Sequence, residues 1–157
     1  LPGQLEREAR RQQLSRMLAE IETRMEEENA RPQKRFISPA TQEAVYALYY
    51  DKLRRTIETR GTLNFPQAGG KKLYGELTMV ITVDSRGRLL QTEVVRASGL
   101  SLLDQRAVAI VRSAAPFDAF SANMRRQADQ IVVVTRFLFS KEGTLETRML
   151  AAEPKRP

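Results

Sequence analysis

Residues 131–139 form the longest run of β-branched and aromatic residues in the chain, Ile-Val-Val-Val-Thr-Arg-Phe-Leu-Phe. This composition is a strong strand signal. Because successive side chains point to opposite faces of a strand and both faces here are mostly apolar, we expect this strand to be well covered. Lys141-Glu142-Gly143 then predicts a turn, and Thr144–Leu150 alternates as a weaker, more polar strand. The strong strand is therefore predicted to lie near a sheet edge, behind a segment that could be displaced.

The middle of the chain predicts the rest of a small sheet. Gly75–Asp84 alternates regularly, as a half-buried strand does, and Asp84–Gly87 is typical of a hairpin turn. Arg88–Ala97 returns as the partner strand, with a slip in its alternation that indicates a bulge. Residues 101–114 have the 3.6-residue period of a helix that lies across the hairpin. The predicted fold is α+β: a small antiparallel sheet of three or four strands with one helix packed on it, preceded by two N-terminal helices.

The N-terminal part predicts a charged helical arm over residues 1–61. Leu5–Asn29 has a narrow apolar stripe, which suits either a solvated or packing helix or a self-associating coiled coil. A linker is expected near residues 30–37. A second helix is expected from Ser38 to Gly61, with Gly61 as its C-terminal stop. We assign residues 62–150 to the sheet domain and residues 151–157 to a disordered tail.

The chain of 157 residues contains no Cys, His or Trp, which excludes thiol catalysis, His-based triads and zinc sites with sulfur or imidazole ligands. Gly69–Lys72 lacks the spacing of a phosphate-binding loop. The candidate carboxylates are Glu76, Asp84, Glu93, Asp104 and Glu142, and nothing in the sequence pattern places two of them in one concave site. We therefore expect no enzyme activity, no cofactor and no metal.

The formal net charge is +7, from 26 Lys and Arg against 19 Asp and Glu. Such a balance permits an anionic partner, but the basic residues are scattered and show no aromatic interleaving typical of nucleic-acid binding. A solvated basic surface is the favoured interpretation. The chain begins at Leu1 without Met and has no apolar run near the roughly 18–20 residues of a membrane span. We expect it to be a piece of a longer protein, with any membrane anchor upstream.

A series of short motifs, in order, resembles the C-terminal domain of TonB family energy transducers. The motifs are Asn64-Phe65-Pro66, Tyr74-Gly75-Glu76-Leu77, Val83-Asp84 to Gly87, Val94 to Ser98-Gly99, Leu103-Asp104 to Ala107, Ala114-Ala115-Pro116-Phe117 and Arg136-Phe137-Leu138-Phe139. The resemblance covers about Thr62 to Thr147. The chain departs from the family pattern in three ways: Phe65 stands where Tyr is usual, the stretch before it is not Gln-rich, and the Pro-rich spacer is absent from this sequence.

The resemblance implies a periplasmic domain, anchored in the inner membrane by a segment outside this chain and driven by the ExbB–ExbD proton motor. Its partners would be outer-membrane transporters that import iron complexes, haem or vitamin B12. In that family a transporter segment, the TonB box, adds as a strand to the last main strand. By position this strand comprises Ile131, Val132, Val133, Val134, Thr135, Arg136, Phe137, Leu138 and Phe139, and Phe65 and Pro66 would be additional contacts.

Other functions remain open from the sequence. The alternative is a structural envelope-spanning or cell-wall-binding protein of TolA type, which would use the basic arm on anionic polymer. A nucleic-acid-binding module is a third and remote hypothesis. Polymer binding should weaken steeply with salt, whereas strand addition should respond mildly. Paired or swapped edge strands would allow a homodimer.

Overall fold

The computed structural model describes residues 2–30 and 39–156 and divides into two compact units. The first contains helix α1 (Pro2–Ala30), as the narrow apolar stripe of Leu5–Asn29 predicts. The second contains everything from helix α2 (Pro39–Leu63) to the last strand. Of the linker predicted near residues 30–37, Ala30 is the last residue of α1, and residues 31–37 lie outside the described residues. No helix among those residues has a stretch long and apolar enough to cross a membrane.

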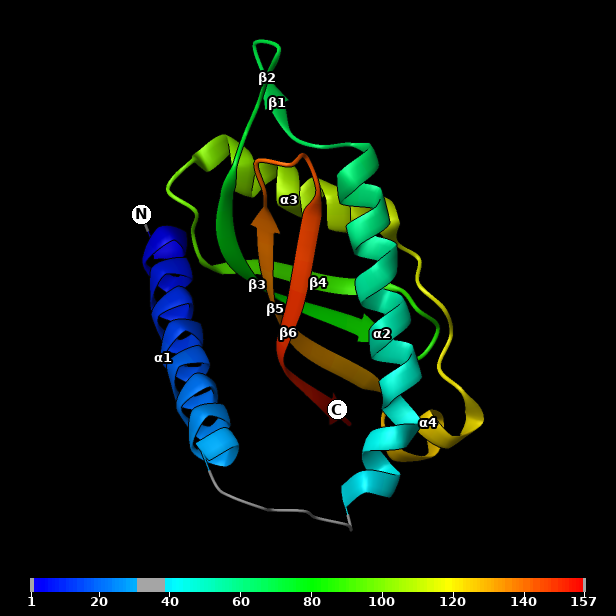
Figure 1. Cartoon of the computed structure of the whole chain (residues 1–157). Helices are drawn as coiled ribbons and strands as arrows, with labels where there is room; N and C mark the ends of the chain where they lie inside the picture. The colour runs from blue at the N-terminus through cyan, green and yellow to red at the C-terminus, as the bar shows by residue number, and fades with distance from the viewer. Residues whose placement is uncertain (1, 31–38, 157) are drawn as a thin grey trace. The chain divides into compact units, whose positions relative to one another are not determined.

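A four-stranded antiparallel sheet forms the centre of the second unit, with the strand order β4-β3-β5-β6 (Figure 1). Its strands are β3 (Gly75–Asp84), β4 (Leu89–Arg96), β5 (Gln130–Phe139) and β6 (Leu145–Lys155). Strands β3 and β5 pair over their full lengths, and the predicted bulge of β4 lies at Leu90, which the register with β3 skips. A small hairpin, β1 (Gln67–Ala68) with β2 (Lys71–Lys72), precedes the sheet. These elements confirm the predicted α+β class.

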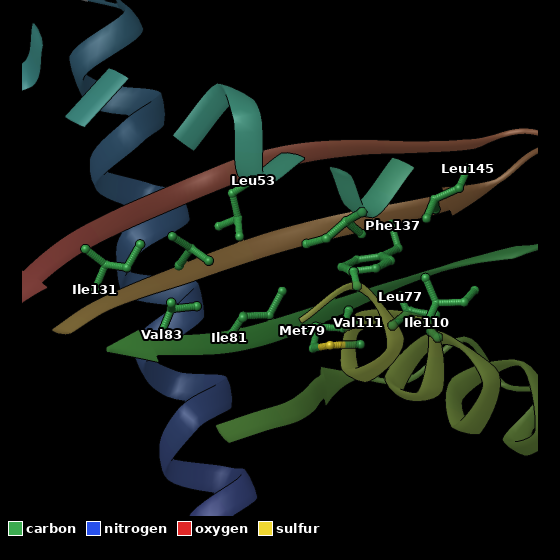
Figure 2. Close-up of a cluster of buried hydrophobic side chains, with 14 of the residues drawn as sticks. Leu53, Leu77, Met79, Ile81, Val83, Ile110, Val111, Ile131, Phe137 and Leu145 are labelled. Atoms are coloured by element: carbon green, nitrogen blue, oxygen red, sulfur yellow. The ribbon is translucent and has the colours of Figure 1, made fainter. Parts of the chain in front are cut away.

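Helices α2 and α3 (Ser101–Ala114) bury the inward side chains of the sheet in one core. Figure 2 shows side chains of β3 and β5 meeting Leu53 of α2 and Ile110 and Val111 of α3. Helix α2 packs beside β6, and α3 packs beside β4. The short helix α4 (Ala122–Gln127) adds Met124 to the core. Each of β3 and β5 contributes four fully buried apolar residues: Leu77, Met79, Ile81 and Val83, and Ile131, Val133, Phe137 and Phe139.

The predicted domain boundary at residues 61/62 is wrong, because α2 is part of the sheet domain and not of an arm. Tyr46, Leu53 and Ile57 are buried in the core beside the sheet. Gly61 does not stop the helix, which continues to Leu63. A Cβ at position 61 would lie 2.3 Å from Cδ2 of Leu145, so glycine is needed there for the close approach of α2 to β6.

The predicted disordered tail at residues 151–157 is also wrong for residues 151–155, which continue strand β6 to Lys155. Pairing with β5 explains this: the register runs from Phe139–Leu145 to Gln130–Lys155, with one shift between Val134 and Thr135. A long neighbouring strand can hold a segment of weak strand propensity by main-chain hydrogen bonds.

Candidate functional site

All nine residues of the predicted binding strand lie on β5, between β3 on one side and β6 on the other. Strand β6 occupies the β5 edge at ten paired positions. The segment expected to cover this edge, Thr144–Leu150, therefore supplies only the first half of the cover. A peptide that adds to β5 must displace β6.

A partner strand in the plane of the sheet can pair only with main-chain groups of β5, because the β5 side chains point to the two faces of the sheet. Ile131, Val133, Phe137 and Phe139 are fully buried on the core face. On the other face, Arg136 Nε lies 3.0 Å from Glu76 Oε1, and Leu138 is half-exposed. Because the inward side chains stay in the core when an edge strand is exchanged, β5 can keep its shape while its partner changes.

The first half of β6 is held firmly by α2. Glu58 Oε2 accepts hydrogen bonds from the main-chain N–H of Thr147, at 2.7 Å, and from its hydroxyl, at 3.0 Å. Thr62 Oγ1 accepts from the main-chain N–H of Leu145 at 3.0 Å. Side-chain oxygens of α2 thus satisfy two donors of an edge strand that would otherwise need water or another strand. The Leu145 side chain is buried in the core.

The Glu58 carboxylate is itself fixed by a charged network along α2. Arg54 Nη1 donates to both carboxylate oxygens of Glu58, at 3.0 and 3.1 Å, and Arg54 Nη2 donates to Asp51 at 2.9 Å. These hydrogen bonds and the neighbouring carboxylates raise the pKa of Arg54, with the bond to Asp51 the largest cause. The guanidinium stays charged and orients Glu58 towards β6.

The second half of β6 is held more weakly. Ala151 and Ala152 are partly exposed, and Glu153, Pro154 and Lys155 are exposed. At its end, the main-chain N–H of Asp129 donates to the Lys155 carbonyl at 2.9 Å. The next residue, Arg156, donates to the main-chain carbonyls of Arg125 and Arg126 and lies 3.6 Å from Asp129 in an ion pair that is half exposed on both sides. Exposed pairs of this kind contribute about 0–1 kcal/mol. Strand β6 is therefore anchored chiefly at its start.

The two additional residues predicted to contact a partner, Phe65 and Pro66, are both buried. The Phe65 ring packs edge-on against Phe139 with the ring centres 5.6 Å apart, and Lys72 Nζ lies 5.7 Å from the centre of the Phe65 ring. Phe65 supports the end of β5 from the core side. The structure thus gives it a packing role, and a contact with a partner would require its exposure.

Two of the carboxylates that the sequence analysis names, Asp84 and Asp104, accept hydrogen bonds from nearby main-chain N–H groups. Asp84 Oδ1 accepts from the main-chain N–H groups of Arg86 and Arg88, as expected for the hairpin turn. Asp104 accepts from the N–H of Ser98. Within the described ranges, no three acidic residues lie together as potential metal ligands.

The α2 residues that hold β6 were missed at the sequence level. Asp51, Arg54 and Glu58 follow the i, i+3 and i, i+4 spacing of an ordinary solvated helix face, which carries no sign of a partner strand. The position of Thr62 beside Leu145 depends on how α2 packs. The usable signal is Gly61, the small residue next to Thr62, but a glycine at this place is also typical of a helix stop.

The family comparison matches residues 63–147, more than half of the chain, to the model described as Gram-negative bacterial TonB protein C-terminal. The matched region runs from the end of α2 through β5 and into the first half of β6. No curated protein and no solved structure matches significantly. With the sheet, its crossing helix and this match taken together, the chain belongs to the family of Gram-negative bacterial TonB C-terminal domains.

Proposed function

We propose that this domain is a non-enzymatic force transducer that binds the TonB box of outer-membrane transporters by strand addition to β5. The pull would come from the ExbB–ExbD motor, through an inner-membrane anchor outside this chain. The family match supports the periplasmic setting and the class of partner. The observation that carries the proposal is β5 itself: a ten-residue strand, rigidly paired with β3, whose other edge is covered by an unevenly anchored strand.

Binding by this route is an exchange of one strand for another. Each main-chain hydrogen bond between β5 and β6 is replaced by one to the peptide, so their net contribution is small. The cost lies in freeing β6 from α2 and in ordering the peptide. We therefore expect modest affinity, around micromolar or weaker, which suits a transducer that must release its partner in every cycle.

The anchoring of β6 predicts where exchange begins. The more exposed half of β6, Ala151–Lys155, can separate first and open β5 at residues 130–134. The register shift between Val134 and Thr135 already interrupts the ladder there. The first half of β6, held by Glu58 and Thr62, would then either remain paired or leave in a second step. A pull directed along the strand would load all the main-chain bonds together.

The test is an NMR titration of the labelled chain with a synthetic TonB-box peptide, following backbone amide shifts and amide exchange. We expect shifts along Ile131–Phe139 and loss of protection first in Ala151–Lys155. The control is the same peptide with proline at alternate positions, which cannot complete the ladder. Shifts confined to other elements, or none at millimolar peptide, would overturn the proposal.

A further inference from the structure

The residue that follows β6, Arg156, reaches the end of helix α4 with its side chain. Its Nη2 donates hydrogen bonds to the main-chain carbonyls of Arg125, at 3.3 Å, and of Arg126, and its Nη1 lies 3.6 Å from Asp129 Oδ1. We call these two carbonyls and the Asp129 carboxylate the cation corner. The cation corner lies directly before β5, which begins at Gln130.

The chemistry of the cation corner suits a positive charge. The last carbonyls of a helix have no partner within the helix, so the carbonyls of Arg125 and Arg126 need an outside donor. The Asp129 carboxylate adds a negative charge beside them. The side chains of the two arginines are exposed, and that of Arg126 donates to Asn123 Oδ1, away from the corner. Their charges therefore stay hydrated, and the corner accommodates the Arg156 guanidinium in spite of them.

A buried hydroxyl of α2 borders the same place. Tyr46 is 4% exposed, and its hydroxyl is buried without a hydrogen-bond partner among the described residues. Burial raises the pKa of Tyr46, and the positive charge of Arg156 opposes this rise, so the guanidinium and the hydroxyl lie within electrostatic range. A buried hydroxyl without a partner is costly, and a cation with several N–H donors is a suitable neighbour for it.

Arg156 fills the cation corner only while the second half of β6 remains on β5. In the register of the two strands, Lys155 is the last paired residue, opposite Gln130. A segment that replaces β6 at residues 130–134 and runs in the same direction therefore brings its next side chain to the corner. A neutral side chain there would leave the two carbonyls and the carboxylate to water, and an acidic one would meet a like charge.

We propose that the cation corner is a subsite for an Arg or Lys of the partner segment, at the position that follows its paired residues. The proposal rests on the strand exchange at β5 proposed above and adds a requirement on the partner's sequence. In the chain without a partner, Arg156 occupies the subsite and competes with the partner's cation. Arg suits the subsite better than Lys, because a planar guanidinium donates to several oxygens at once.

Three blocked six-residue peptides test this subsite. They share five residues of alternating Val and Thr and end in Arg, Gln or Glu, and each is titrated into the labelled full chain by NMR. Amide shifts on residues 130–134 report strand exchange, and the ratio of the dissociation constants of the Gln and Arg peptides reports the subsite. We expect the Arg peptide to bind about five-fold more tightly than the Gln peptide, and the Glu peptide most weakly. Because the chain has a net charge of +7, unspecific attraction would give the opposite order.

Three variants locate the preference. Asp129→Asn should reduce the ratio to about two-fold or less. This variant also frees Arg156 and so eases the binding of all three peptides, which is why the ratio is the readout. Arg156→Gln should widen the ratio to about ten-fold, because the displaced native cation no longer competes for the subsite. Glu142→Gln changes an exposed carboxylate in the β5–β6 turn, outside the corner, and should leave the ratio unchanged.

The outcomes separate the subsite from the strand exchange. Equal affinities for the Arg and Gln peptides in both the unchanged chain and Arg156→Gln would overturn the subsite, while shifts on residues 130–134 would still support strand exchange. A full preference for Arg in Asp129→Asn would place the cation elsewhere and overturn the subsite as well. Absence of shifts on β5 with all three peptides would overturn both the exchange and the subsite that depends on it.

Discussion

Glu58 on α2 and Thr147 on β6 are joined by two hydrogen bonds, from the main-chain N–H and the hydroxyl of Thr147 to one carboxylate oxygen at 2.7 and 3.0 Å. The residues are 89 positions apart in the sequence. Through this contact a helix that precedes the family-matched region holds the strand that covers the proposed binding edge. Without a partner, α2 therefore holds β6 in place beside β5.

Removal of this contact should loosen β6. Glu58→Ala leaves the Thr147 N–H without its partner, while alanine preserves the helix. We expect a loss of about 1–2 kcal/mol in unfolding free energy, the scale of a partly exposed hydrogen bond to a charged group. Amide exchange should accelerate in residues 145–150, and the affinity for a TonB-box peptide should rise about three- to ten-fold.

Two variants control this experiment. Glu58→Gln keeps an acceptor oxygen but loses the ion pair with Arg54, so its effect should be intermediate. Glu146→Ala changes an exposed carboxylate on the same strand and should alter neither quantity appreciably. Equal peptide affinity in Glu58→Ala and the unchanged chain would show that α2 does not restrain β6.

Removal of the weakly held half of β6 should expose β5 without unfolding the core. Truncation after Leu150 deletes residues 151–157 but retains the buried Leu145 and Leu150. We expect cooperative thermal unfolding to persist and peptide affinity to increase, because the peptide no longer competes with the strand on residues 130–134. Calorimetric titration measures the change. Truncation after Lys155 is the matched control, because it keeps all of β6 and removes Arg156, with its ion pair to Asp129 and its hydrogen bonds to the carbonyls of Arg125 and Arg126, and the final residue.

The central strands could be predicted because their own residues determine them. The alternation of Gly75–Asp84 and the β-branched run of 131–139 fit one buried face whatever surrounds them. The second half of β6, Ala-Ala-Glu-Pro-Lys, has little strand propensity and was predicted to be disordered. It is a strand because β5 offers it a ladder, which is a tertiary effect that propensity does not contain.

The packing of α2 against the sheet differs more from the prediction than the end of β6 does. The periodicity of residues 38–61 correctly predicts a helix, and its spacing predicts an apolar face of Val45, Leu48, Tyr49, Leu53 and Ile57. In the structure Leu48 is 83% exposed, whereas Tyr46 is buried. A helical pattern indicates that some surface covers the helix without indicating which one. Since α2 was assigned to an arm, the contacts of Glu58 and Thr62 with β6 could not be predicted. The sequence predicts β5 as a strand, but it does not predict the helix that holds its neighbour β6.

The β3–β4 turn should make stability sensitive to acid. Burial alone would raise the pKa of Asp84, but hydrogen bonds from the Arg88 N–H and side chain and from the Arg86 N–H outweigh it and lower the pKa below the usual value. A carboxylate with a depressed folded-state pKa stabilises the fold above its unfolded pKa, and this contribution is lost as the pH falls through the folded value. We expect unfolding free energy to fall below about pH 4.

Asp84→Asn tests this assignment, because the amide oxygen can accept hydrogen bonds but does not titrate. Denaturant unfolding at a series of pH values should show a smaller acid-induced loss in the variant, together with lower stability near neutral pH. Asp118→Asn is a control, because Asp118 is exposed and pairs with an exposed lysine, Lys52. Identical pH profiles for the unchanged chain and Asp84→Asn would contradict the assignment.

The close approach of α2 and β6 at Gly61 predicts an inverted helix-propensity effect. Gly→Ala within a helix normally stabilises by about 0.5–1 kcal/mol. Here a Cβ would lie 2.3 Å from Leu145 Cδ2 and 3.1 Å from its Cβ, so either the helix or the strand must shift. We expect Gly61→Ala to destabilise by about 1–3 kcal/mol, as overpacking does.

Leu145→Ala alone should cost about 2–5 kcal/mol by opening a cavity. In the double variant the new methyl group partly fills that cavity, so the combined loss should be at least about 1 kcal/mol smaller than the sum of the single losses. Denaturant unfolding of the four proteins completes the cycle; additive losses would place Gly61 and Leu145 out of contact.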